Sequence, residues 1–298
     1  MPDQAENLRR LLRRMEALGW RATAGRPEQP GRARTVAVTG GKGGVGKSCL
    51  AVNLGLALAN SGRKVLLVDA DLGLASADLL LGLSPEATLA EVTLDDLPVR
   101  QALVSVAPGL DLLPGVAGVA ELADLSPVAR QQLIAALAAL EDDYDLVLVD
   151  TAAGAGEGVR AFLRAADRVL VVATPEPAAV TDAYALVKLL RAEGQAELGL
   201  AVNMARSERE GRRVAERVAQ VARRYLEAEL ELLGSVPFDW QVAAAARARR
   251  PLLAAAPYAP ASHAVRTLAG RLVRWALPAT EARGRGGLVG LLSRAVGT

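Results

Sequence analysis

The chain has 298 residues, 51% of them hydrophobic, and a formal net charge of +2. This length permits one large α/β domain or two smaller domains, and the composition permits a sizeable core. The small net charge argues against a protein that coats nucleic acid, so we do not expect DNA as a partner. A single cysteine, Cys49, excludes an internal disulfide, and the lone His263 excludes a histidine metal centre.

The N-terminal residues 1–20 are predicted to form one amphipathic helix. Leucines recur along one side between Leu8 and Leu18, while arginines crowd the other positions. Residues 21–33 contain prolines and glycines and are predicted to be a linker. No stretch near the start resembles a secretory signal, and no run approaches the roughly eighteen apolar residues of a membrane span. We therefore expect a cytoplasmic protein with a tethered N-terminal helix.

Residues 40–48 read Gly-Gly-Lys-Gly-Gly-Val-Gly-Lys-Ser and follow a short apolar run, Thr35–Thr39. They fit the phosphate-loop pattern G-x-x-x-x-G-K-[ST], with a strand-like run before the loop and a helical pattern after it. Glycines let the backbone approach phosphate oxygens, and successive N–H groups at a helix start form an anion site. The predicted site for ATP or ADP consists of Gly41, Gly43, Gly44, Val45, Gly46, Lys47, Ser48 and Cys49.

Two lysines lie in this loop, although the whole chain contains only four. Lys47 is predicted to bind the β- and γ-phosphates, because a compact ammonium on a flexible stem suits them. The Ser48 hydroxyl is predicted to bind Mg²⁺, and the Cys49 side chain to fill core space. Lys42 is an extra lysine at the start of the loop. The alternative interpretation is a glycine-rich turn that resembles a phosphate loop by chance.

Residues 34–278 alternate between strand-like and helix-like segments. The predicted strands are mostly continuous apolar runs, typical of parallel strands buried on both faces, and span 35–39, 64–69, 110–113, 145–150, 168–173, 197–203 and 231–236. The predicted helices between them span 47–60, 126–141, 178–192 and 209–229. This alternation predicts one α/β domain with a doubly wound, mostly parallel sheet flanked by helices.

Two of the predicted strands end in aspartates, at the edge of the sheet where such folds bind ligands. Asp69 and Asp71 close the strand 64–69, and Asp150 closes the strand 145–150. Asp150 has the Walker B form and is predicted to hold Mg²⁺, with Asp69 supporting the metal. Asp71 is predicted to orient a water molecule for attack on the γ-phosphate. The alternative is that these aspartates merely end the strands in solvent.

Asn203 ends the predicted strand 197–203. Its side-chain amide could both donate and accept hydrogen bonds at the edge of adenine. The alternative is an asparagine that only forms part of a turn. Pro237 and Asp239 follow the last predicted strand and are predicted to close the base pocket.

Residues 279–298 are predicted to be a flexible tether followed by a short amphipathic segment, 288–296. Leu288, Leu291 and Leu292 share one face of that segment, which favours a helix on a membrane surface. A segment this short binds marginally alone, so we expect binding from two copies on a dimer. A tail that packs on the body or stays disordered is the alternative.

The two loop lysines, together with Asp69-Ala70-Asp71 and Asp150, resemble the deviant Walker A family of MinD and ParA. The resemblance covers residues 34–277. It implies an ATPase that uses ATP and Mg²⁺, forms a homodimer with ATP and hydrolyses it slowly in the dimer. It also implies that Lys42 reaches across the dimer to the partner subunit's phosphates, with Lys47 and Asp71 completing the catalytic set.

Three segments resemble one group of that family, FlhG, also called FleN or YlxH, which regulates flagellar number and placement. They are residues 3–9, 71–83 and 174–188. The first resembles a motif that stimulates the signal-recognition-type GTPase FlhF, which implies FlhF as a partner. The group further implies contacts with flagellar C-ring proteins and reversible binding to the inner face of the cell membrane.

Three other functions compete with this interpretation. A ParA-type partitioning ATPase could bind DNA phosphates through Arg247, Arg249 and Arg250, or through the arginines near Arg212 and Arg223. A MinD-type regulator would act on the division site. A Mrp-like or nitrogenase-like iron–sulfur protein would need several thiolates, and the chain has one cysteine.

Overall fold

The structure, a computed structural model, describes residues 33–71, 76–88, 92, 97–115, 140–195 and 197–277. The predicted N-terminal helix, the tail 279–298 and most of the helix predicted for 126–141 lie outside these residues. The linker 21–33 also lies outside them, except for Ala33. Predictions for these segments therefore stay predictions.

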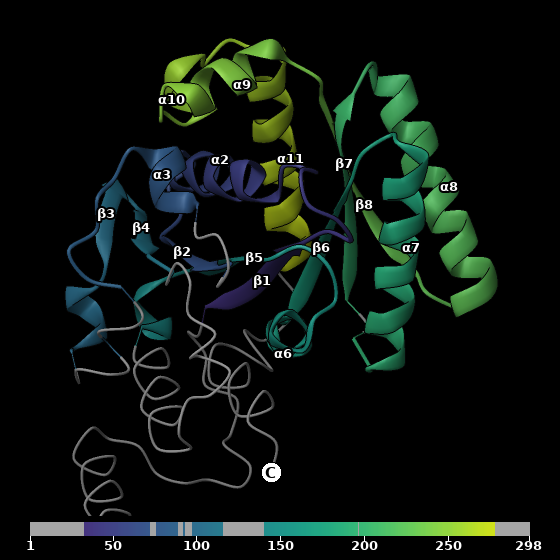
Figure 1. Cartoon of the computed structure of the whole chain (residues 1–298), viewed down its shortest axis with the longest axis horizontal. Coiled ribbons are helices and arrows are strands. Elements are labelled where there is room, and N and C mark those ends of the chain that lie inside the picture. The colour runs from purple at the N-terminus through teal and green to yellow at the C-terminus, as the bar shows by residue number, and fades with distance from the viewer. Residues whose placement is uncertain are drawn as a thin grey trace, which may run out of the picture.

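One sheet organises the described residues (Figure 1), and its strand order is β3-β4-β2-β5-β1-β6-β7-β8. All neighbouring strands are parallel except the pair of β3 and β4, which is antiparallel. The strands are β1 Arg34–Thr39, β2 Val65–Ala70, β3 Val104–Ala107, β4 Leu110–Leu113, β5 Leu146–Thr151, β6 Arg168–Ala173, β7 Leu198–Ala205 and β8 Leu230–Pro237. The predicted doubly wound, mostly parallel sheet is confirmed.

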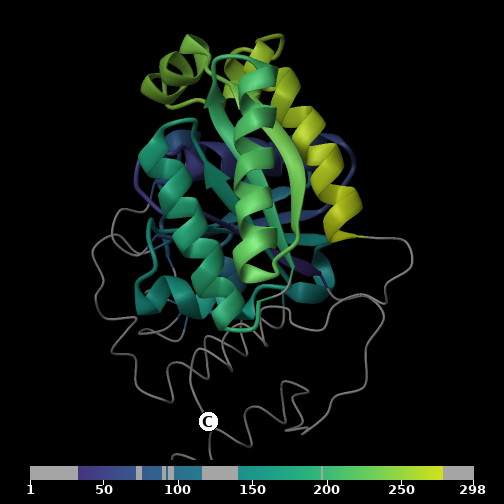
Figure 2. The same cartoon turned by 90° about the vertical axis from the view of Figure 1, so that its right-hand side faces the viewer.

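The sheet is covered by helices on both faces. The α-helices are α2 Lys47–Asn60, α3 Ala77–Leu81, α6 Glu157–Ala165, α7 Pro177–Ala192, α8 Glu208–Leu226, α9 Trp240–Arg247, α10 Leu252–Ala255 and α11 Pro260–Ala276. Within the described residues, 3₁₀ turns span Val99–Gln101 and Glu141–Asp143. Figures 1 and 2 show α11, in yellow, on one face of the sheet and α7 and α8, in teal and green, on the other.

The two faces form two separate apolar cores. Successive side chains of a strand point to opposite faces, so Val36 and Val38 of β1 belong to the core that contains α2 and α11, whereas Ala37 belongs to the core that contains α7 and α8. Five central strands are buried on both faces, namely β1, β2, β5, β6 and the first five residues of β7. This explains why they read as continuous apolar runs in the sequence.

Several elements were not predicted. The edge strand β3 has four residues, mostly half-buried, and turns back into β4 through Gly109 at φ 84°. The helices α3, α6, α9, α10 and α11 were also missed. The short ones give too few residues for a periodic signal, and alanine-rich stretches blur the apolar stripe of α9.

Candidate nucleotide-binding site

The glycine-rich loop between β1 and α2 has the backbone of an anion cradle. Gly44 and Gly46 have φ values of 79° and 86°, which favour glycine. Gly46 is the N-cap residue of α2, and no side chain caps that helix. No acidic residue lies in the first turn either, so the N–H groups and the positive end of the helix are available to an anion.

The loop is packed on one side and open on the other. A Cβ added to Gly41 would lie 2.5 Å from Cβ of Asp182 in α7, so the backbone there lies directly against that helix. A Cβ added to Gly43 or Gly44 would meet nothing within 4 Å. The open side leaves room for phosphate groups, while the packed side fixes the loop to α7.

Lys47 begins α2 and is 7% exposed. Burial lowers the pKa of its ammonium, while the nearby carboxylates of Asp150 and Asp71 offset part of that effect. The loop therefore brings Lys47 close to two of the three predicted carboxylates.

Asp150, at the end of β5, is 0% exposed. Neither of its carboxylate oxygens has a hydrogen-bond partner among the described residues. Burial, together with the nearby carboxylates of Asp69 and Asp71, raises the pKa of Asp150 to about 7, although the nearby Ser48 hydroxyl and the Lys47 ammonium act to lower it. A buried carboxylate without a partner is costly, and a bound cation would satisfy it.

These residues fit Mg²⁺. Ser48 offers a hydroxyl and Asp150 an oxygen, and both lie at the phosphate loop. Mg²⁺ commonly takes one or two protein oxygens and completes its shell with water and phosphate oxygens. It therefore needs no preformed acidic cage, and the described residues contain no group of three acidic, histidine or cysteine side chains that could form one.

Asp69 lies beside Asp150, since the two residues are register partners in β2 and β5. Its carboxylate already has partners. Oδ1 accepts the backbone N–H of Asp71 (3.1 Å), and Oδ2 accepts those of Ser76 (2.9 Å) and Ala77 (3.0 Å). Burial raises the pKa of Asp69, and these three hydrogen bonds lower it. These contacts occupy both oxygens of Asp69, and its predicted metal role stays a prediction.

Asp71 is half-buried and lies just beyond β2. It is near enough to Lys47 to act on the pKa of that lysine. Asp71 therefore lies close to Lys47 of the phosphate loop, and its role in orienting water stays a prediction.

Lys42 has a partner that the sequence did not reveal. Its Nζ forms an ion pair with the carboxylate of Glu176, the N-cap residue of α7. The Lys42 side chain is 33% exposed and that of Glu176 is 66% exposed. Glu176 lies in the segment 174–188, which resembles the FlhG group. The spacing of residues in the sequence does not predict its contact with Lys42.

The loop after β5 also contacts the phosphate loop. The N–H of Gly154, which has φ 90°, donates to the carbonyl of Gly40 (3.0 Å). Three residues earlier in the chain, the Thr151 hydroxyl of β5 donates to the carbonyl of Val38 (3.1 Å). The ends of β1 and β5 are therefore joined by hydrogen bonds as well as by the sheet.

The predicted adenine residues have structural contacts of their own. Asn203 donates from Nδ2 to the Val45 carbonyl (2.9 Å) and accepts the N–H of Met204 at Oδ1 (3.0 Å). Asp239 accepts the N–H of Gln241 (3.0 Å) and that of Ala261 (3.3 Å), which joins the starts of α9 and α11. Pro237 is the last residue of β8 rather than a residue after it. The adenine pocket stays a prediction.

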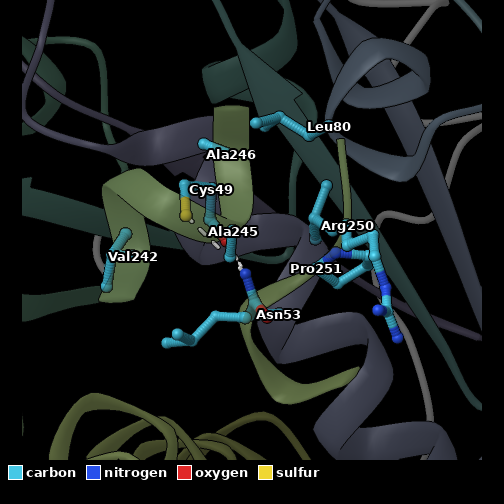
Figure 3. Close-up of a pocket in the computed structure, with 10 residues that line it drawn as sticks. Cys49, Asn53, Leu80, Val242, Ala245, Ala246, Arg250 and Pro251 are labelled. Carbon is cyan, nitrogen blue, oxygen red and sulfur yellow. Dashed lines mark hydrogen bonds between the residues drawn. The ribbon is translucent and has the colours of Figure 1, made fainter. Parts of the chain in front are cut away.

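A small cavity lies between α2, α3, α9 and the start of α10 (Figure 3). Asn53 links two of these elements, because its Nδ2 donates to the Cys49 carbonyl (2.7 Å) and its Oδ1 accepts the N–H of Leu253 (3.0 Å). The half-buried Cys49 lines this cavity, and burial raises the pKa of its thiol. The Cys49 side chain is thus more exposed than a fully buried core side chain.

Comparison with known proteins agrees with this geometry. A model of the ParA family, described as "NUBPL iron-transfer P-loop NTPase", matches residues 32–273. The chain is 43% identical over 247 residues to the antiactivator FleN of Pseudomonas aeruginosa, covering 83% of this chain and 88% of FleN. It is 34% identical to the flagellum site-determining protein YlxH of Helicobacter pylori, covering 83% of this chain and 84% of YlxH.

Among solved structures, MinD of Pyrococcus horikoshii in complex with Mg-ADP is similar. It has a TM-score of 0.68 and 28% identity, covering 80% of this chain and 96% of MinD. That relative holds the nucleotide and the metal for which the phosphate loop, Ser48 and Asp150 are suited here. The iron-transfer wording of the family model has no counterpart in the chemistry of this chain, whose only thiol is Cys49. The chain belongs to the MinD/ParA family of P-loop NTPases, in the group that contains FleN and YlxH.

Proposed function

We propose that the protein is an ATP-dependent switch ATPase that controls flagellar number and placement. The observation that carries this proposal is the phosphate loop with Asp150 beside it, whose buried oxygens have no hydrogen-bond partner in the described part of the chain, in a protein 43% identical to FleN. The printed names of FleN and YlxH, an antiactivator and a flagellum site-determining protein, support the flagellar assignment. The switch has two states, a monomer and an ATP-bound homodimer.

In this proposal each residue of the site has one task. Lys47 neutralises the β- and γ-phosphates, Ser48 and Asp150 hold Mg²⁺, and Asp71 orients the attacking water. Mg²⁺ supplies positive charge for the phosphate oxygens. Slow hydrolysis then ends the dimeric state and returns the protein to the monomer.

Lys42 acts across the dimer on the partner subunit's phosphates. In the monomer it pairs with Glu176, and both side chains are partly exposed. Ion pairs of this kind contribute at most about 1 kcal/mol, because water and side-chain entropy oppose them. Lys42 can therefore leave Glu176 at little cost when phosphate groups offer more negative charge.

The flagellar assignment is tested by counting flagella on cells of the source organism in which the gene carries Lys47→Ala or Asp71→Ala. Lys47→Ala cannot enter the ATP state, whereas Asp71→Ala cannot leave it, so we expect both to change the number of flagella per cell. Unchanged flagellar number and position in both strains would contradict the flagellar function.

The proposed partners outside the homodimer are FlhF, C-ring proteins and the membrane surface, which makes the protein cytoplasmic and reversibly peripheral. No described helix has both the length and the apolar character that a bilayer crossing requires. Residues 1–20 are proposed to stimulate FlhF, since an arginine or glutamine supplied by one protein can accelerate GTP hydrolysis by another. A peptide of residues 1–20 should raise GTP turnover by purified FlhF. A peptide with Gln4→Ala and Arg9→Ala is the control, and equal stimulation by both would contradict this role.

One observation favours a second candidate, a ParA-type ATPase that binds DNA. Residues 240–277 contain six arginines and no aspartate or glutamate. Arg247, Arg249 and Arg250 are exposed, and none forms an ion pair within the described part of the chain. By contrast, Arg212 pairs with Glu208 and Arg223 with Glu229.

This candidate predicts salt-sensitive binding of the ATP-bound protein to a DNA duplex of arbitrary sequence. Replacing Arg247, Arg249 and Arg250 by serine should weaken that binding. Replacing Arg212 and Arg223 by serine is the matched control, because their charge is already balanced by a neighbour. No binding of the unaltered protein at low salt, measured by fluorescence anisotropy, would exclude this candidate.

A further inference from the structure

Asp69 differs from the other acidic residues of the site in what it contacts. It is 1% exposed at the end of β2, and its carboxylate accepts three backbone N–H groups. All three donors come from one short stretch of chain, at Asp71, Ser76 and Ala77. Each distance lies between 2.9 and 3.1 Å, the normal range for such hydrogen bonds.

These bonds hold the chain on both sides of residues 72–75. Oδ1 fixes Asp71, the residue proposed to orient the attacking water, and Oδ2 fixes the first residues of α3. The N-cap residue of α3 is Ser76, whose own side chain makes no capping hydrogen bond. The carboxylate of Asp69, at the end of the preceding strand β2, therefore caps this helix.

The same contacts argue against Asp69 as a direct ligand of Mg²⁺. Its oxygens already have three donors, whereas both oxygens of Asp150, its register partner, have none among the described residues. If a metal ion took an oxygen of Asp69, at least one backbone N–H would lose its acceptor. Leaving a buried donor unsatisfied costs about 1–3 kcal/mol. Asp150 offers the metal an oxygen without that cost.

We propose that Asp69 is a positioning residue for ATP hydrolysis. It fixes the backbone at Asp71 and at the start of α3, and so places the Asp71 carboxylate beside the phosphate loop. Asp69 touches neither the metal nor the water. This inference rests on the proposed role of Asp71. It adds that Asp69 holds Asp71 in the position that this role requires.

An asparagine at position 69 has nearly the same shape but only one acceptor oxygen. Its NH₂ group would face a backbone N–H, so one side of the arrangement would lose its hydrogen bonds. Asp71 would then be held less accurately. A displacement of about 1 Å in a reacting group can lower a rate by about 100-fold.

The test is a double-mutant cycle on the full chain with Asp69→Asn, Asp71→Asn and the double variant, measuring kcat and KM for ATP. We expect Asp69→Asn to lower kcat by roughly 10- to 100-fold, with little change in KM or in the Mg²⁺ concentration for half-maximal rate. The double variant should be no slower than Asp71→Asn alone within about two-fold, because Asp69 acts only through Asp71.

Three results would overturn the proposal. The first is an unchanged kcat in Asp69→Asn. The second is a double variant slower than Asp71→Asn by the full factor of the Asp69 change, and the third is a several-fold shift in half-maximal Mg²⁺, which would mark a metal ligand. ADP affinity and thermal unfolding report whether each variant folds, and Asp69→Ser repeats the cycle independently. If Asp71→Asn itself leaves kcat unchanged, the proposed role of Asp71 fails instead.

Discussion

At the scale of single residues, two aspartates of the site have different hydrogen-bond partners although they lie side by side. Asp69 and Asp150 are both buried, both end central strands and are partners in register. Asp69 accepts three backbone N–H groups, whereas neither oxygen of Asp150 has a partner among the described residues. The sequence predicted a metal role for both, because it shows where a strand ends but not which N–H groups return to it.

Lys47→Ala should abolish ATP binding. The loop would keep its N–H cradle but lose the cation next to the most highly charged phosphates. Lys64→Ala is a suitable control, since Lys64 is also a lysine but is exposed beyond the far end of α2. Isothermal titration of both variants with ATP checks the prediction, and near-normal affinity of Lys47→Ala would contradict the assignment of the loop.

Gly41→Ala should destabilise the protein, and Gly43→Ala should not. The new Cβ at position 41 would lie 2.5 Å from Cβ of Asp182, so α7 must move, whereas at position 43 nothing lies within 4 Å. Overpacking of this kind costs about 1–3 kcal/mol. Chemical unfolding of the two variants measures the difference, and equal stability would show that α7 does not constrain the loop.

At the scale of elements, the sequence predicted the central strands and the long helices α2, α7 and α8 to within about three residues. The central strands carry continuous apolar runs because helices cover both faces of the sheet, and the long helices carry apolar residues where they pack on it. The sequence did not predict β3 or α11. The first is short and lies at an edge, and the second has small residues, Ala261 and Ser262, among its buried positions.

The sequence indicates candidate site residues but not the contacts that hold them in place. The phosphate loop, Lys47 and Asp150 follow from spacing at strand ends. The partners Glu176 and Asp182 do not, because α7 reaches the loop only through the packing of β6 beside β1. Asn203 was predicted to face adenine, and the structure adds that it holds the loop through the Val45 carbonyl.

The C-terminal segment 288–296, outside the described residues, should bind a membrane surface only in the ATP state. One copy has too little apolar surface, while two copies on a dimer gain from effective concentration. Sedimentation with anionic vesicles should therefore depend on ATP and on Leu291 and Leu292. A Leu291→Glu, Leu292→Glu variant that sediments like the unaltered protein would contradict the prediction.

At the scale of the whole molecule, the topology gathers the site from distant parts of the chain. The strands β2, β5, β1 and β6 are neighbours in the sheet, so Asp69, Asp150 and the phosphate loop meet at their carboxyl ends, and α7 begins just beyond β6. The site leaves Lys42 paired with Glu176 at the surface of the monomer. The proposed action of Lys42 on a second subunit therefore requires a dimer.

The most direct test is the mass of the Asp71→Ala variant in solution, measured by size-exclusion chromatography with light scattering, in ATP and in ADP. Asp71→Ala should bind ATP without hydrolysing it, so we predict a dimer with ATP and a monomer with ADP. Adding Lys42→Ala should return the ATP-bound protein to a monomer that still binds nucleotide. A monomer of Asp71→Ala in saturating ATP, or a dimer that does not need Lys42, would contradict the proposed switch.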